Sequence, residues 1–130
     1  MSELQVKEGW ILITRSGSTG ITAVVPKAWD GYAISEHVIR IVPDPLLLAP
    51  EYIYAFLRTR SAQEAISRGV FGSVIDEIDP EFIGNLEVHV PTNADVLERI
   101  VKVIRSGEVA RQSAIVALTT GVDDLDQLLG

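Results

Sequence analysis

The sequence predicts an α+β fold, in which a small β-rich domain with two short helices precedes a long C-terminal helix or helix pair. Three observations support this prediction. Short apolar runs bounded by glycine and proline fill the first part of the chain, two helical patterns lie among them, and the composition changes after Pro91. Residues 94–129 contain no proline and long runs of helix formers. We therefore expect a first part over residues 1–91 and a helical part over residues 92–130.

Four apolar runs in the first part have the composition of β-strands, because they are rich in β-branched or large apolar residues and are bounded by turn formers. The predicted strands are 10–14, 21–25, 38–42 and 86–90. In the last run the apolar residues alternate with Glu87 and His89, which predicts one buried and one solvated face. His89 is then expected to be a solvated histidine that points outward, and not a ligand.

Helix signals lie between the third and fourth predicted strands. Pro50 suits the first position of a helix that continues to residue 60, because its fixed φ fits the first turn and its missing N–H would have no partner there. Ser61 followed by Glu64 has the spacing of a capping box and predicts the start of a second short helix. Gly69 is suited to end that helix in the left-handed conformation. A glycine-hinged loop and a turn at residues 79–80 are then expected.

The helical part has its own start signal, since Thr92 and Asp95 again have capping-box spacing. Apolar residues follow a heptad pattern that Gly107 and two later residues interrupt, so a coiled coil is not expected to run unbroken. Glycine costs about 1 kcal/mol in a helix interior, which favours a kink near Gly107. A helix with so many apolar residues needs a partner, which would be the domain itself, a second copy or another protein.

Composition limits the classes of function. The 130 residues include no cysteine, which excludes disulfides, thiolate zinc sites and cysteine nucleophiles. The chain shows neither a signal peptide nor an apolar run near the roughly 18 residues that span a bilayer, so a cytoplasmic protein without membrane contact is expected. The net charge of −7 opposes non-specific affinity for nucleic acid. Any contact with DNA must therefore come from a local cluster of basic residues.

The loop "TRSGSTG" at 14–20 is the segment that most resembles a functional site. It lacks the lysine of a phosphate-binding P-loop and the GxSxG spacing of a nucleophile elbow. No catalytic residue, metal ligand or cofactor site is expected anywhere in the chain. Two interpretations of the loop stay open: a β-turn in which Gly17 or Gly20 supplies a positive φ, or a turn that also presents donors to phosphate oxygens or base edges. Those donors would be Arg15, Ser16, Ser18 and Thr19.

The order of the segments resembles that of a known family. The segments are "GWILITRSGSTGITAVVP", "YAISEHVIRIVPDP", "PEYIYAFLRT" and "GSVIDEIDPEFIGNLEVHVP", followed by the long helix. From residue 9 to about residue 120 they resemble the DNA specificity subunits of type I restriction-modification systems, and similar domains at the end of some fused restriction-methylation enzymes. The resemblance implies a target recognition domain that presents loops to double-stranded DNA, is joined to a spacer helix and has no catalytic activity of its own.

The resemblance also implies partners. In such subunits two recognition domains occur in one chain, their long helices pack antiparallel, and DNA methyltransferase (modification) subunits dock against them. Here there is one unit, and only eight residues precede Gly9. We therefore expect a partial, half-subunit-like chain: a fragment, a naturally shortened half subunit or the tail of a larger split protein. A half subunit would restore the two-unit layout as a homodimer through its C-terminal helices.

The DNA-binding residues predicted for this chain combine the RSG-type loop of the family with two nearby basic residues. They are Arg15, Ser16, Gly17, Ser18, Thr19, Lys27 and Arg40. Two other functions stay open. The chain would be a protein-interaction module of the same family that has lost DNA contact and acts through its helix, or an enzyme whose site is not recognisable from its motifs.

Overall fold

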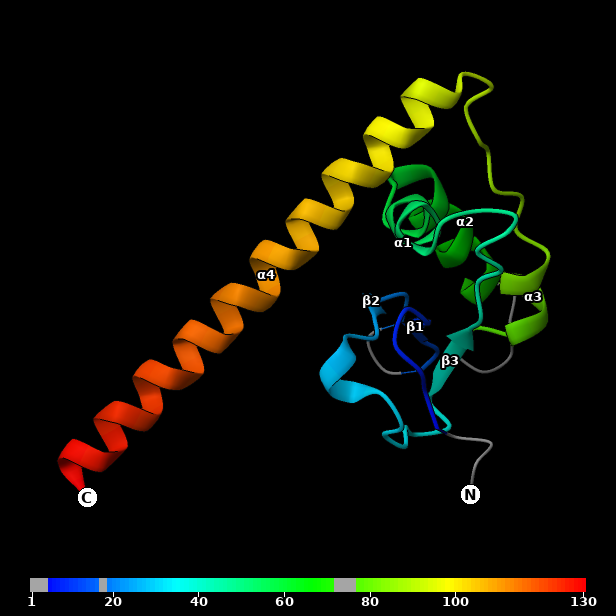
Figure 1. The fold of residues 1–130 in the computed structure, drawn as a ribbon. Helices are drawn as coiled ribbons and strands as arrows, with labels where there is room; N and C mark the ends of the chain where they lie inside the picture. Colours follow the sequence, from blue (N-terminus) through cyan, green and yellow to red (C-terminus); the bar gives the residue numbers. More distant parts are fainter. Residues whose placement is uncertain (1–4, 17–18, 72–76) are drawn as a thin grey trace. The chain divides into compact units, whose positions relative to one another are not determined.

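The structure is a computed structural model that describes residues 5–16, 19–71 and 77–130. It divides into two compact units, Met1–Pro91 and Thr92–Gly130. The first unit contains a three-stranded antiparallel sheet and short helices, and the second is one long helix (Figure 1). The predicted α+β class is therefore confirmed.

The sheet has the strand order β2-β1-β3. The strands are β1 (Ile11–Thr14), β2 (Thr22–Val24) and β3 (Val38–Ile41). In the central strand, Leu12 lies opposite Ala23 on one side and Arg40 on the other. The first three predicted strands are thus present, each shortened at one or both ends.

The fourth predicted strand, residues 86–90, is wrong, because this segment belongs to no β-ladder. The predicted alternation is visible only over residues 86–89: Leu86 and Val88 are half-buried and His89 is exposed, but Val90 is exposed as well. A helix side chain holds this segment, since the Tyr52 hydroxyl donates a hydrogen bond to the backbone carbonyl oxygen of His89. Alternating hydrophobicity reports one buried face, but it does not show that a neighbouring strand offers free N–H and C=O groups.

The short helices begin at different residues from those predicted, apart from the first. Helix α1 (Pro50–Leu57) starts at its proline as expected. Helix α2 (Arg60–Phe71) is capped by Thr59, whose hydroxyl accepts from the Ala62 N–H at 3.3 Å, and not by Ser61. A third helix, α3 (Pro80–Gly84), replaces the predicted turn, because the Asp79 carboxylate accepts from the Glu81 N–H at 3.0 Å and caps a full turn.

Gly69 does not end α2 as predicted but lies inside the helix. A Cβ at this position would lie 2.7 Å from the aromatic ring of Phe82 in α3. The glycine is needed for close packing of two helices and not for a left-handed cap. Its role depends on a residue 13 positions further along the chain, which no local signal reveals.

The first unit buries apolar residues on both faces of its sheet. Ile11 and Ile13 are fully buried on one face, and the helices add Tyr54, Leu57 and Ile66 to the core. On the other face Leu12 packs in a cluster with buried residues from the N-terminal segment and the end of β2, namely Val6 and Val25. Residues 5–6, for which no element was predicted, are bound to the segment 31–33, with the Val6 N–H donating to Tyr32 O at 2.9 Å.

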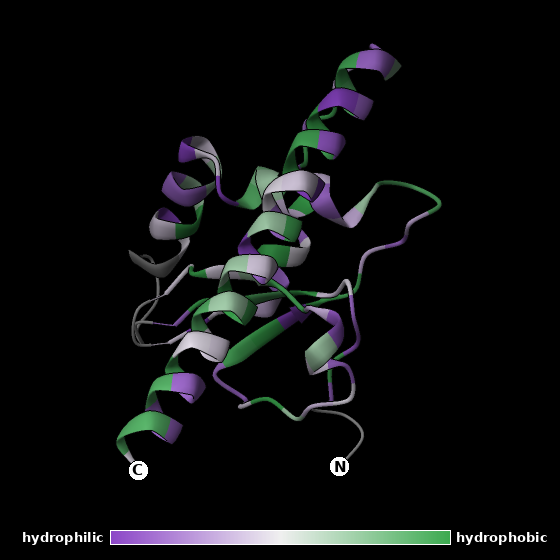
Figure 2. Ribbon diagram, turned by 60° about the vertical axis from the view of Figure 1, so that its left-hand side comes forward, coloured by the Kyte–Doolittle hydropathy of each residue, from purple (hydrophilic) through white to green (hydrophobic). Residues whose placement is uncertain are grey.

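Helix α4 (Ala94–Leu129) is one continuous helix of 36 residues, which passes through Gly107 without interruption. Its cap is Asn93 instead of the predicted Thr92, because the Asn93 side chain accepts from the Asp95 N–H at 2.9 Å. No residue of α4 is buried. Hydrophobic residues recur along its length to the C-terminal end (Figure 2). The large ones that are exposed are Val103, Val109, Ile115, Val116, Leu118, Val122, Leu125, Leu128 and Leu129.

Candidate nucleic-acid interface

The loop that follows β1 meets the segment that precedes β3 at one end of the sheet. Because Thr14 pairs with Val38, the chain positions just beyond them lie opposite each other. The Arg15 N–H donates to the carbonyl oxygen of His37 at 2.9 Å. The Ser16 hydroxyl oxygen lies 2.8 Å from His37 Nδ1. The structure thus places a predicted DNA-binding residue, Ser16, in contact with His37, for which no role was predicted from the sequence.

Arg15 is paired at this end of the sheet. Its Nη2 lies 3.5 Å from Glu77 Oε2, and the two side chains are 30% and 34% exposed. Its Nε is buried and makes no hydrogen bond to the described residues. Its carbonyl oxygen accepts from the Ile78 N–H at 2.8 Å, which fixes residues 77–78 to the loop. Arg15 therefore holds the loop together, and its positive charge is partly balanced by a carboxylate.

The far end of the same loop rests against helix α2. Gly20 has a φ of +83°, so the glycine of the predicted turn at this position does supply a positive φ. Its carbonyl oxygen accepts from Gln63 Nε2 at 3.2 Å, and the same amide donates to Leu57 O at 2.7 Å. Thr19, beside it, is half-buried. The two other predicted loop residues, Gly17 and Ser18, lie outside the described residues.

Helix α2 presents basic side chains next to this contact. Arg60, Glu64 and Arg68 are spaced by four residues and therefore share one exposed helix face. Together with Gln63 and Ser67 they line a shallow groove. Arg60 forms an ion pair with Glu64, with Nε 3.1 Å from Oε1, while Arg68 has no ion pair with a described residue. Gln63 thus connects the loop to a groove that has an arginine at each end.

The two remaining predicted residues lie elsewhere. Lys27 is exposed at the start of the 3-10 helix η2 (Lys27–Trp29), which follows β2 and so lies beyond the opposite end of the sheet from the loop. Arg40 is half-buried in the middle of β3, where its Nη1 donates to Gln5 O at 3.0 Å. Of the described predicted residues, the structure brings together Arg15, Ser16 and Thr19, but it does not bring Lys27 or Arg40 to them.

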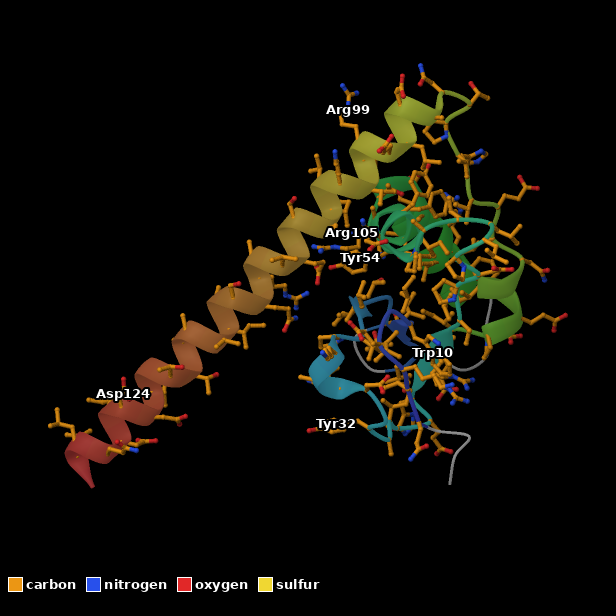
Figure 3. All side chains as sticks on the ribbon, in the orientation of Figure 1. Trp10, Tyr32, Tyr54, Arg99, Arg105 and Asp124 are labelled. Carbon is orange, nitrogen blue, oxygen red and sulfur yellow. The ribbon has the colours of Figure 1, made fainter. Side chains whose placement is uncertain are left out.

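Arg58 has an internal partner and adds little to this face. Its guanidinium lies 5.3 Å from the ring centroid of Tyr54, and its Nη1 donates to the Tyr54 hydroxyl at 2.6 Å. Figure 3 shows Tyr54 in the first unit, and it also shows Arg99 and Asp124 projecting from α4.

In the first unit, ion pairs occupy Arg15 and Arg60, and stacking on Tyr54 occupies Arg58. This leaves Arg68 as the most available cation beside the loop.

Other kinds of site find little support in the described part of the chain. No group of three His, Asp or Glu side chains among residues 5–16, 19–71 and 77–130 could hold a metal ion. The Ser16–His37 pair resembles part of a catalytic triad, but no carboxylate of these residues forms a hydrogen bond with His37 to orient it. No helix of the described residues is long and apolar enough to cross a membrane.

Comparison with known proteins assigns the family. A family model described as the type I restriction modification DNA specificity domain matches residues 1–109. This match includes the whole first unit, with its sheet, loop and α2, and the first part of α4. No curated protein and no solved structure matches the chain. Because the matched residues make up most of the 130, the chain belongs to the family of type I restriction modification DNA specificity domains.

Proposed function

We propose that this chain is a DNA sequence-recognition module of a type I-like restriction-modification system, which positions a methyltransferase or endonuclease on DNA and performs no chemistry itself. The main support for this role is the contact between Gln63 and Gly20, which lies between the donor-bearing loop and the arginines of α2. Phosphate contacts would fix the position of the module on the duplex, and loop donors would read base edges.

The charge distribution fits a local interface. The chain carries a net charge of −7, so its affinity for DNA must come from a few cations close together. Arg60 and Arg68 lie along one groove beside the loop, and the Arg60 side chain is 93% exposed. Each arginine that neutralises a phosphate releases about one counterion, which makes binding fall with salt. Two or three such contacts would give modest affinity, which a larger assembly would increase.

Helix α4 is the proposed site of assembly. Its 36 residues span about 54 Å at 1.5 Å per residue, with exposed leucine and valine side chains along the length. A helix of this kind is stabilised mainly by packing its apolar residues against a partner. We propose a second copy of the chain or a DNA methyltransferase subunit as that partner, with the homodimer placing two recognition units on two half-sites.

One observation favours the alternative, a protein-interaction module without DNA contact. Two of the arginines at the candidate interface face carboxylates, since Arg15 pairs with Glu77 and Arg60 pairs with Glu64. If DNA does not displace these carboxylates, the face is too weakly positive to hold a duplex. The chain would then act through α4 alone.

Fluorescence anisotropy of a labelled mixed-sequence duplex tests the proposal, with the chain alone and with a methyltransferase subunit of the same system. We expect affinity to fall linearly in log salt, and Arg68→Ala to reduce the slope by about one. Lys27→Ala is the comparison variant, and a smaller slope for it as well would extend the interface to the other end of the sheet. Absence of binding in both compositions would leave the protein-interaction alternative.

A further inference from the structure

We propose that His37 is a second DNA contact, which donates a hydrogen bond from Nε2 to a backbone phosphate oxygen. This inference rests on the proposed function and adds to the interface the segment before β3, in which no DNA-binding residue was predicted. His37 is exposed, and it lies where that segment meets the loop after β1. The candidate interface is therefore built from two segments that are 21 residues apart.

Three hydrogen bonds fix the backbone and ring of His37. Its N–H donates to Ser35 Oγ at 3.2 Å, and its carbonyl oxygen accepts from the Arg15 N–H at 2.9 Å. Its Nδ1 lies 2.8 Å from Ser16 Oγ. An exposed side chain that is held in this way loses less conformational entropy when it binds a ligand than a free one does. The ring is thus preorganised for a contact at its remaining nitrogen.

The Ser16 contact is compatible with a hydrogen on Nε2. When the Ser16 hydroxyl donates to Nδ1, the neutral imidazole carries its hydrogen on Nε2. When the ring is protonated, Nδ1–H donates to Ser16 and Nε2 again carries a hydrogen. Within the described residues Nε2 has no hydrogen-bond partner. These two states present an N–H donor outward, which suits a phosphate oxygen, whereas the neutral tautomer in which Nδ1–H donates to Ser16 presents Nε2 as an acceptor.

Two substitutions at the same position separate a phosphate contact from a merely structural role. In His37→Asn the side-chain amide reaches the place of Nδ1 and keeps a partner for Ser16, but nothing remains at Nε2. In His37→Gln the amide reaches the place of Nε2 and keeps the donor, but the Ser16 contact is lost. His89→Gln is the matched control, because His89 is the other histidine of the chain and is also exposed. Melting temperatures of all variants establish that they fold.

The measurement is anisotropy with the mixed-sequence duplex, in whichever composition of chain and methyltransferase subunit the parent binds. We expect His37→Asn to weaken binding about fivefold, the size of one hydrogen bond. His37→Gln should weaken binding less, because it keeps a donor at the place of Nε2 but loses the Ser16 contact, and His89→Gln should bind as the parent does. Parental binding by His37→Asn together with weaker binding by His37→Gln would overturn the inference in favour of a structural role. Equal binding by all variants would also overturn it, with the proposed function intact. No binding by the parent in either composition would overturn both.

Discussion

The two units differ in how far they bury their apolar residues. The first unit buries apolar residues of its sheet and of its helices, with Ile13 and Ile66 almost inaccessible. Helix α4 buries none of its residues and leaves Leu118 71% exposed. The first unit therefore contains its own core, whereas the helix has no buried residue to stabilise it by packing. This difference fits the proposed division of recognition and assembly between the two units.

The largest effect should separate the two units directly. Ile66→Ala is expected to lower the free energy of unfolding by about 2–5 kcal/mol, because it empties part of a buried site. Leu118→Ala should change it by less than about 0.5 kcal/mol in dilute protein, because its side chain is exposed. Urea unfolding at two protein concentrations measures both. A Leu118→Ala effect that appears only at high concentration would identify a second copy as the partner, and a large effect at every concentration would break the comparison.

Substitution of two helix glycines by alanine tests the same contrast, because the two changes in stability should have opposite signs. Gly69→Ala should destabilise the first unit by about 1 kcal/mol, because the new Cβ would force the Phe82 ring to move. Gly107→Ala should stabilise α4 by up to about 1 kcal/mol, since alanine is the better helix former and the added Cβ meets no atom within 4 Å beyond its chain neighbours and the local helix backbone. Thermal unfolding followed by circular dichroism measures both shifts. Stabilisation by Gly69→Ala would show that α2 and α3 do not pack as closely as described.

The smallest expected effect concerns the end of the first unit that carries the proposed DNA contacts. Glu77→Gln removes the carboxylate that faces Arg15, at a separation of 3.5 Å. Exposed ion pairs contribute about 0–1 kcal/mol, so the fold should hold while the guanidinium becomes available to phosphate. We expect roughly twofold tighter binding to the mixed-sequence duplex and a steeper salt dependence. Glu98→Gln, on α4, removes the same charge in the other unit and is the control. Tighter binding by both variants would indicate only a change in net charge.

Several features were predictable because they depend on near neighbours in the chain. Proline at position 50 predicted the start of α1, and β-branched runs predicted the three strands. Errors arose where a local pattern had more than one structural meaning. Glycine is common at helix caps, but Gly69 allows close contact between two helices. Apolar and polar residues alternate over 86–90 as in a strand, but no neighbouring strand pairs with this segment.

The candidate interface divides in the same way. The loop with Arg15 and Ser16 was found from its donors and glycines, whereas Lys27 and Arg40 were grouped with it only by charge. Their separation follows from the strand register, which places one beyond the opposite sheet end and the other in mid-strand. His37 was missed because the sequence does not show that β3 pairs with β1. Had that pairing been known, the residue before β3 would have been expected opposite the residue after β1.

By itself, the sequence determined the fold class, the change of character after Pro91 and the resemblance to DNA specificity subunits, because propensity, spacing and segment order are local properties. Only the tertiary structure decided which distant side chains meet. Ser16 and His37 are 21 residues apart, and Gln63 and Gly20 are 43 apart. Such contacts depend on strand register and on helix packing against the sheet, and these are set by the whole core and not by any short segment.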